Sequence, residues 1–182
     1  MNYIAFLRGI NVGGHHKVPM AELREELGKV GCQNPVTILN SGNIIFDTNG
    51  ENLKTIEEQI EQHLETYFGF SIPTIIRRSS TLIDLYRSEP FQDIHLTKET
   101  RLYISFLKKE VNSELTLPWT SDDGSYCILQ QSDGNVLSTL DLSVSKTPKA
   151  MEALEQFYGK EITTRNWKSI GRIEKKISVS SQ

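Results

Sequence analysis

Cysteine is scarce in this sequence, which has only Cys32 and Cys127 among its 182 residues. The two lie far apart, and neither stands at the spacing of a metal-binding pair. We therefore expect two buried or half-buried reduced thiols. His15 and His16 are adjacent, so their side chains point apart, and no Cys, Asp or Glu stands beside them at ligand spacing. They are interpreted as histidines of a surface loop, and no metal site is expected.

Long apolar runs and an excess of positive charge are missing as well. The first apolar run, Tyr3 to Leu7, ends at Arg8 and is too short for a signal peptide or a membrane span. The net charge is -3 and the pI is near 5.8, so no overall basic field draws the protein to nucleic acid or anionic lipid. We expect a cytoplasmic protein with an ordinary core, no membrane or nucleic-acid partner and no cofactor.

The glycines that are present gather in one segment, Arg8-Gly9-Ile10-Asn11-Val12-Gly13-Gly14, called here the glycine loop. It follows the predicted strand Tyr3–Leu7 and precedes a helix start at Val18-Pro19-Met20. Glycine allows tight turns and a close approach of the backbone to a ligand, and Arg8 and Asn11 add planar hydrogen-bonding groups. This pattern is typical of an anion cradle at a helix N-terminus. It also fits a purely structural turn, and it is neither a P-loop nor a dinucleotide-binding fingerprint.

Periodicity predicts a βαββαβ order, the ferredoxin-like unit, for residues 1–78. The predicted helices cover about 19–30 and 52–68, and Glu57, Glu58 and Glu61 are interpreted as a solvated face of the second. The predicted strands after the first are Val36–Leu39, Ile44–Phe46 and Ile72–Ile76. The first helix carries an apolar stripe of Met20, Leu23, Leu27 and Val30, and the second one of Leu53, Ile56, Ile60, Leu64 and Tyr67.

The remainder of the chain repeats parts of this pattern after a linker, residues 79–100, with a short helix that Ser80 could cap. Tyr103-Ile104-Ser105-Phe106-Leu107-Lys108 resembles Tyr3-Ile4-Ala5-Phe6-Leu7-Arg8, and two later segments also match in order. We therefore predict an internal duplication, with a second ferredoxin-like subdomain at 101–164 and a C-terminal helix and tail at 165–182. Between Lys109 and Ser125 we expect a shorter, looped crossover.

This topology predicts which loops lie together. Strands one and three form the central antiparallel pair of a βαββαβ sheet, so the glycine loop should lie beside the hairpin Ser41-Gly42-Asn43. Backbone N–H groups, a helix dipole and one guanidinium at the same place suit a phosphate, carboxylate or sulfate. The candidate ligand-binding residues are Arg8, Gly9, Asn11, Gly13, Gly14, Ser41, Gly42 and Asn43.

A second, basic and aromatic segment contains Arg165, Asn166 and Trp167. It is a possible second binding patch, and the alternative is a helix with a solvated basic face and Trp167 docked as an anchor. The predicted strand Ile44–Phe46 lacks the basic and aromatic series of RNA-binding modules with this topology. Asp122-Asp123-Gly124 is interpreted as a turn.

The glycine loop, the Ser41-Gly42-Asn43 motif and Thr164-Arg165-Asn166-Trp167 together resemble the signature of a bacterial family known as domain of unknown function 1697. The resemblance extends over essentially the whole chain. It implies a pair of ferredoxin-like α+β subdomains in a cytoplasmic bacterial protein, and it implies no established activity, substrate or catalytic residue. The sequence departs from the family at Ile38-Leu39-Asn40 and at Lys168-Ser169-Ile170.

From the residues we therefore expect a protein that binds a small anionic or phosphorylated ligand at the glycine loop. One alternative is an enzyme acting on such a ligand, although the linear sequence shows no acid–base pair and identifies no catalytic residue. Another is a protein-interaction or regulatory module. The sequence leaves the oligomeric state open.

Overall fold

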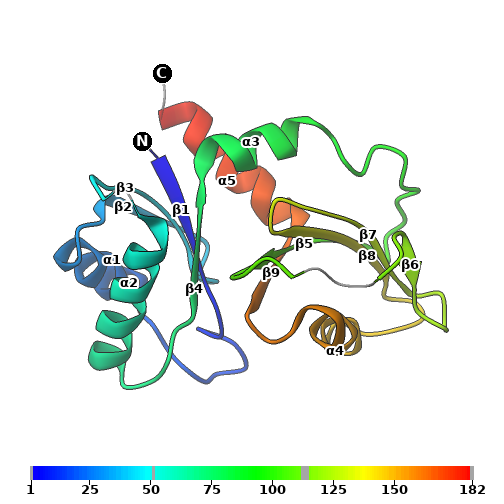
Figure 1. Ribbon diagram of the computed structural model, residues 1–182, viewed down its shortest axis with the longest axis horizontal. Coiled ribbons are helices and arrows are strands. Elements are labelled where there is room, and N and C mark those ends of the chain that lie inside the picture. Colours follow the sequence, from blue (N-terminus) through cyan, green and yellow to red (C-terminus); the bar gives the residue numbers. More distant parts are fainter. Residues whose placement is uncertain (1, 51, 112–114, 181–182) are drawn as a thin grey trace. The chain divides into compact units, whose positions relative to one another are not determined.

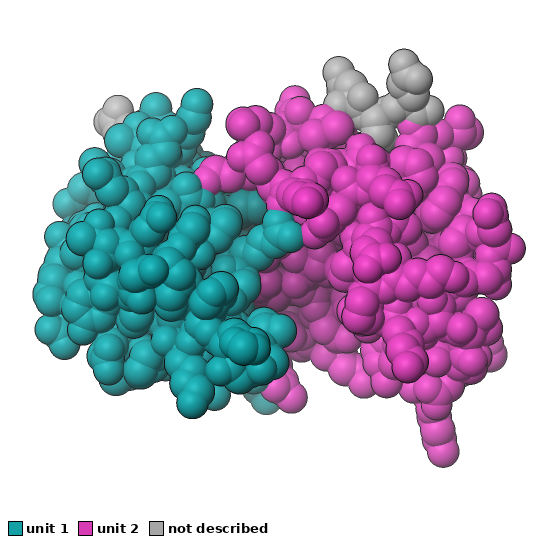
Figure 2. Space-filling view, turned by 90° about the horizontal axis from the view of Figure 1, so that it is seen from below, with its two compact units in different colours: residues 1–88, 173–182 teal, residues 89–172 magenta. Residues whose placement is uncertain are grey.

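The computed structural model describes residues 2–50, 52–111 and 115–180. The chain forms two compact units, one made of Met1–Ser88 with Ile173–Gln182 and the other of Glu89–Arg172, which Figure 2 shows in separate colours. Within the described residues there are two antiparallel sheets and five helices (Figure 1). The prediction of a mixed α+β protein is confirmed.

The first unit has one four-stranded antiparallel sheet. Its elements are β1 (Asn2–Leu7), α1 (Met20–Lys29), β2 (Gln33–Ile38), β3 (Asn43–Asp47), α2 (Leu53–Phe68) and β4 (Thr74–Arg78). The strand order is β2-β3-β1-β4, and β1 pairs with β3 so that Phe6 lies opposite Asn43. The predicted central pairing of the first and third strands is confirmed, and it fixes the end of the sheet at which the glycine loop leaves.

Helices α1 and α2 supply one side of a core against β1. Asn52 caps α2 by accepting bonds from the backbone N–H groups of Lys54 and Thr55, and Gly69 ends it in the left-handed conformation. Burying a leucine or isoleucine side chain contributes about 1.5–3 kcal/mol, so this core dominates the stability of the unit. Its apolar members on these elements are Tyr3, Ala5, Leu7, Leu23, Leu27, Ile56, Ile60 and Leu64.

Two predictions for the surface of α2 are wrong. Tyr67 is 49% exposed rather than buried, and its ring lies 5.9 Å from the Nζ of Lys29. Glu57 is buried and Glu61 half-buried, whereas Glu58 is exposed as predicted. The reason is that α2 lies beside β4, and the two carboxylates turn inward to that strand.

β4 is an edge strand whose outward N–H groups are satisfied by these carboxylates. The backbone N–H of Ile76 donates to Oε1 of Glu57 at 2.6 Å, and that of Thr74 donates to Oε1 of Glu61 at 2.7 Å. Glu57 and Glu61 are four residues apart, one helical turn, while Thr74 and Ile76 are two apart on one side of a strand. The helix thus covers a sheet edge that would otherwise expose unpaired backbone donors.

A third helix, α3 (Ser79–Arg87), follows β4 and contacts both β1 and β4. The predicted cap by Ser80 is wrong: the helix begins at Ser79, so Ser80 lies within it, and no side chain caps it. At its other end Nη2 of Arg87 lies 3.1 Å from Oε1 of Glu174. This ion pair joins α3 to the last helix, α5 (Trp167–Ser180), within the first unit.

The second unit has a five-stranded antiparallel sheet. Its elements are β5 (Thr100–Leu107), β6 (Trp119–Thr120), β7 (Tyr126–Ser132), β8 (Asn135–Asp141), α4 (Thr147–Tyr158) and β9 (Ile162–Asn166). The order is β6-β7-β8-β5-β9. Between β5 and β7 the described residues contain the short β6 and no helix, and residues 112–114 of the predicted looped crossover lie outside the described residues.

Helix α4 packs against this second sheet. Its residues Ala150, Leu154 and Tyr158 join a core cluster with Tyr103, Leu107, Tyr126, Ile128, Val136, Leu140 and Ile162. Pro148 stands in its first turn, where its missing N–H costs no helical bond. No helix in the described part of the chain is long and apolar enough to cross a membrane.

Both cysteines are free thiols, Cys32 buried and Cys127 half-buried, as predicted. Burial raises the pKa of the Cys32 thiol to about 12. That thiol therefore stays protonated and unreactive at neutral pH.

Candidate functional site

The glycine loop leaves β1 at one end of the first sheet. Its second half and the three residues that follow it, 11–17 in all, are exposed. Gly9, Gly13 and Gly14 have φ of +75°, +59° and +79°, and a Cβ added at any of them would meet nothing within 4 Å. These glycines therefore serve the backbone conformation, and the space above them is open. Asn11 also has a positive φ, +55°, which asparagine tolerates better than most residues.

The side chain of Asn11 holds the loop to two other segments. Its Nδ2 donates to the backbone oxygens of Val18 at 3.0 Å and Asn40 at 2.9 Å, while its Oδ1 accepts from the N–H of Val18 at 2.9 Å. The amide thus fixes the distance between the loop, the start of α1 and the β2–β3 hairpin. Its role in the structure is to shape this site.

The hairpin Ser41-Gly42-Asn43 is brought against the loop, as the topology predicts. The backbone N–H of Leu7 donates to the oxygen of Gly42 at 2.8 Å. Asn43 is fully buried, and its Nδ2 donates to the oxygen of Ile38 and to Oγ of Ser41, both at 3.0 Å. Gly42 and Asn43 therefore build the turn, while Ser41 is exposed in it.

A third segment, Gly69–Pro73, completes this end of the unit. The N–H of Arg8 donates to the oxygen of Pro73 at 2.8 Å, and the ring of His16 stacks on that of Phe70 with centroids 4.2 Å apart. His15 and His16 are exposed, as predicted for a surface loop. The three segments 8–20, 39–43 and 69–73 contain Arg8, Lys17 and the two histidines, and their sequences contain no carboxylate.

The second unit repeats the same backbone bonds at the equivalent end of its sheet, but a carboxylate lies there beside the lysines. The N–H of Leu107 donates to the oxygen of Gly134 at 2.8 Å, and that of Lys108 to the oxygen of Glu161 at 2.9 Å. Nζ of Lys109 lies 2.7 Å from Oε2 of Glu161, and this contact lowers the pKa of the carboxyl. At this end of the second unit, the carboxylate of Glu161 therefore offsets the charge of Lys109.

The second predicted patch, Arg165-Asn166-Trp167, lies in the other unit, where β9 joins α5. Arg165 is buried, its Nη1 donates to Oγ1 of Thr163 and to the oxygen of Thr164, and burial lowers its pKa to about 10. Oδ1 of Asn166 accepts from the N–H of Lys168. The ring of Trp167 packs edge to face on Phe91 at 5.0 Å. These contacts hold the strand–helix junction.

The sequence model of a family described as "Protein of unknown function (DUF1697)" matches residues 1–125, which is more than half of the chain. The chain belongs to this family. The matched part contains the glycine loop and Ser41-Gly42-Asn43, whereas Thr164–Trp167 lies beyond it. The predicted family resemblance is confirmed.

Among solved structures, the chain is similar to the conserved bacterial protein SP0830 from Streptococcus pneumoniae. The two are 23% identical, the match covers 96% of this chain and 97% of that one, and the TM-score is 0.68. This similarity extends the shared fold over the whole length and says nothing of function. No curated protein matches significantly.

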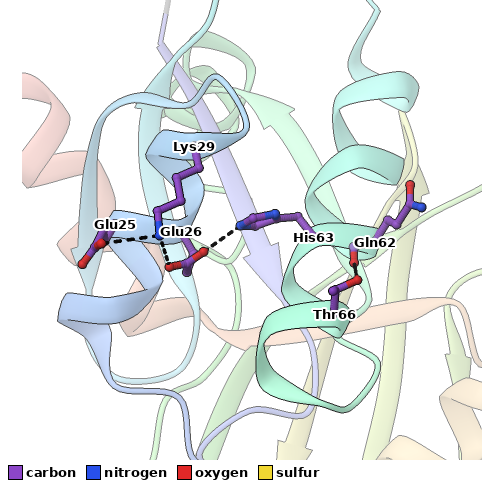
Figure 3. A network of polar contacts seen from close by, with 6 residues as sticks. All are labelled: Glu25, Glu26, Lys29, Gln62, His63 and Thr66. Atoms are coloured by element: carbon purple, nitrogen blue, oxygen red, sulfur yellow. Dashed lines mark hydrogen bonds and ion pairs between the residues drawn. The ribbon is translucent and has the colours of Figure 1, made fainter.

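The polar cluster that sequence reasoning missed lies between α1 and α2 in this family member (Figure 3). The carboxylate of Glu26 is 3% exposed, with Oε1 2.7 Å from Nζ of Lys29 and Oε2 2.8 Å from Nε2 of His63. Lys29 first, and His63 second, lower the pKa of Glu26 against the opposing effect of burial. Among the residues described, no group of three or more His, Cys, Asp or Glu side chains could hold a metal ion.

This cluster predicts a pH-dependent contribution to stability. Because the folded-state pKa of Glu26 lies below its ordinary value of 4.5, its contribution is present above that value and is lost as pH falls through the folded pKa. Glu26→Gln should therefore lower the urea midpoint at pH 7 and have a smaller effect at pH 3.5. Glu25→Gln, whose side chain is 72% exposed, is the control and should change little at either pH. An equal loss for Glu26→Gln at both pH values would contradict this assignment.

Proposed function

We propose that the first unit binds a small anionic or phosphorylated ligand at the glycine loop. One observation carries the proposal: segments 8–20, 39–43 and 69–73, which are joined by hydrogen bonds, contain Arg8, Lys17 and two histidines and have no Asp or Glu in their sequences. An anion placed there meets cationic side chains and the N-terminal end of α1, whose dipole favours negative charge although its first turn also carries Glu22.

The structure suggests a division of roles among the candidate residues. Arg8 neutralises charge, and Gly9, Gly13 and Gly14 let the ligand approach backbone N–H groups because nothing fills the space above them. Asn11, Gly42 and Asn43 shape the site through their internal bonds and packing. Ser41 is exposed in the adjoining turn and orients the ligand.

We also propose that the two units are ferredoxin-like subdomains that arose by duplication. The order β2-β3-β1-β4 of the first corresponds to β7-β8-β5-β9 in the second, and the bonds at Leu7 and Arg8 recur at Leu107 and Lys108. The segment after Lys108 is Lys109-Glu110-Val111, without glycine. A glycine loop needed only to build the fold should have recurred, so its restriction to the first unit supports a binding role.

Thermal unfolding with added anions tests the proposal. Inorganic phosphate, pyrophosphate and a nucleoside monophosphate should raise the Tm of the full chain, since a ligand at 100 times its Kd stabilises the native state by about 2.7 kcal/mol. Arg8→Ala should abolish the rise. Lys108→Ala, which removes a cation from the equivalent position of the second unit, should leave it intact.

Two results would contradict the proposal in different ways. An undiminished rise in Arg8→Ala would place the anion away from the glycine loop. The absence of any rise across a series of phosphates, sulfate and organic acids would leave the loop with a structural role alone.

A further inference from the structure

A pocket of about 370 Å³ lies within the second unit, between the turn after β6 and one face of α4. It is called here the Trp119 pocket, and its lining residues are Trp119, Ser121, Asp122, Asp123, Lys149, Glu152, Ala153 and Gln156. This volume is within the range of small-molecule sites, about 300–1,000 Å³. No residue of the glycine loop belongs to it, so it is independent of the proposed anion site.

The helix wall of the pocket comes from the spacing of four residues on α4. Lys149, Glu152, Ala153 and Gln156 recur at i, i+3, i+4 and i+7, which places them on one face. That spacing usually marks a stripe packed on a core. On α4 the core stripe is a different one, with Ala150, Leu154 and Tyr158 buried. The polar stripe therefore lines a hollow.

The opposite wall is a rigid turn. Oδ1 of Asp123 accepts bonds from Oγ of Ser121, from the N–H of Ser125 and from Oγ of Ser125, at 2.8, 3.1 and 2.6 Å. Its Oδ2 lies 2.7 Å from Nζ of Lys149. These bonds, Lys149 first, hold the pKa of Asp123 well below its usual range, so the carboxylate is ionised at any physiological pH. The turn is thus preorganised and joined to the helix wall.

Trp119 supplies an aromatic surface in a fixed orientation. Its ring packs edge to face on Phe157, with centroids 4.8 Å apart, and is 6.4 Å from the ring of Tyr126. The residue is half-buried, so part of the indole is covered by this cluster and part lines the pocket. An indole face attracts cations more strongly than any other aromatic side chain.

The charge of the lining determines the kind of ligand. Asp122, Asp123 and Glu152 give three carboxylates against the single ammonium of Lys149, which leaves two negative charges in excess. We propose that the Trp119 pocket binds a small organic cation, an ammonium group on a short carbon chain. The ammonium lies against the indole face, and Asp122 and Glu152 supply the opposite charge.

Nuclear magnetic resonance of the two indole N–H groups provides a test that is specific to the pocket. The chain has two tryptophans, so the Trp119 signal reports on the pocket and the Trp167 signal is an internal control. In the full chain, 1,4-diaminobutane should shift the Trp119 signal, and butylamine should do so at higher concentration. Butanol and butyrate, of the same size without the positive charge, should leave it in place. Equal shifts with all four compounds, or none with either amine, would overturn the proposal.

Two substitutions in the lining, one that removes a negative charge and one that removes a positive charge, strengthen this test. Glu152→Gln should weaken the binding of 1,4-diaminobutane by up to about fivefold, and Lys149→Gln should tighten it by a similar factor, because it removes a competing ammonium. Glu155→Gln makes the same charge change on α4 outside the lining and should leave Kd unchanged. A loss of affinity in both Glu152→Gln and Lys149→Gln would mean that the substitutions act through the fold, and the proposal would fall.

Discussion

Gly42→Ala should destabilise the protein by about 2–5 kcal/mol. Gly42 has φ of +74°, and an added Cβ would lie 2.8 Å from Cβ of Leu7, 3.0 Å from Cδ1 of Ile10 and 3.2 Å from the oxygen of Leu7. A left-handed conformation costs an L-residue about 1–2 kcal/mol, and forcing an extra carbon into a packed site typically costs about 1–3 kcal/mol. The nearest atom belongs to β1 close to its backbone, so it cannot move away cheaply. Urea unfolding measures the change.

Gly9→Ala is the matched control, because Gly9 has nearly the same φ, +75°, but nothing within 4 Å of the added Cβ. It should lower the free energy of unfolding only by the cost of the left-handed backbone conformation, about 1–2 kcal/mol. The difference between the two variants therefore isolates the contact with Leu7 from the strain of the backbone. Equal costs would show that the hairpin shifts to accommodate the methyl group.

The roles of Gly42 and Asn43 show where prediction from the sequence reaches its limit. The motif Ser41-Gly42-Asn43 predicts a turn beside the glycine loop, and the structure confirms that placement through the bond from Leu7 to Gly42. The residue types cannot show which way a side chain faces. Asn43 is fully buried within its own turn, although asparagine in a loop suits a ligand equally well.

Elements with strong local signals were predictable. The strand before Arg8 and the glycine that ends α2 each follow from a few adjacent residues, and both are observed. Features made by residues distant in sequence were not. The Trp119 pocket is formed by a turn and by a helix about thirty residues later in the chain. From the sequence alone, the polar stripe on α4 is indistinguishable from an ordinary solvated helix face, because the sequence does not show that the turn lies against it.

The same limit explains the glutamates of α2. Glu57 and Glu58 are adjacent and chemically identical, but Glu57 stands four residues after Leu53 and three before Ile60, on the apolar face of the helix, and Glu58 does not. The charge of a glutamate argues against burial even on that face, and what makes burial possible is β4, whose Ile76 N–H group donates to Glu57. A carboxylate is buried there because an edge strand offers it a backbone donor.

Glu57→Ala should therefore destabilise the protein by about 1–3 kcal/mol, while Glu58→Ala should change the free energy of unfolding by less than about 0.5 kcal/mol. Removing the buried carboxylate leaves the N–H of Ile76 without the acceptor now at 2.6 Å, and the desolvation of an unsatisfied buried donor is the larger part of the cost. The two variants change one methylene-carboxylate each on neighbouring positions of the same helix. Their difference in urea unfolding, free of any change in helix propensity, measures what Glu57 contributes through β4, which is its bond to Ile76 together with its charge interaction with Arg77.

Hydrogen exchange gives this prediction a local readout. In Glu57→Ala the amide of Ile76 should exchange faster than in the unaltered protein by more than the global loss of stability explains, because its own acceptor is gone. The amide of Thr74 still donates to Glu61, and it should follow the global change alone. Equal acceleration at both amides would contradict this prediction. It would show that β4 opens as a single unit and that each glutamate protects both amides rather than only the one that donates to it.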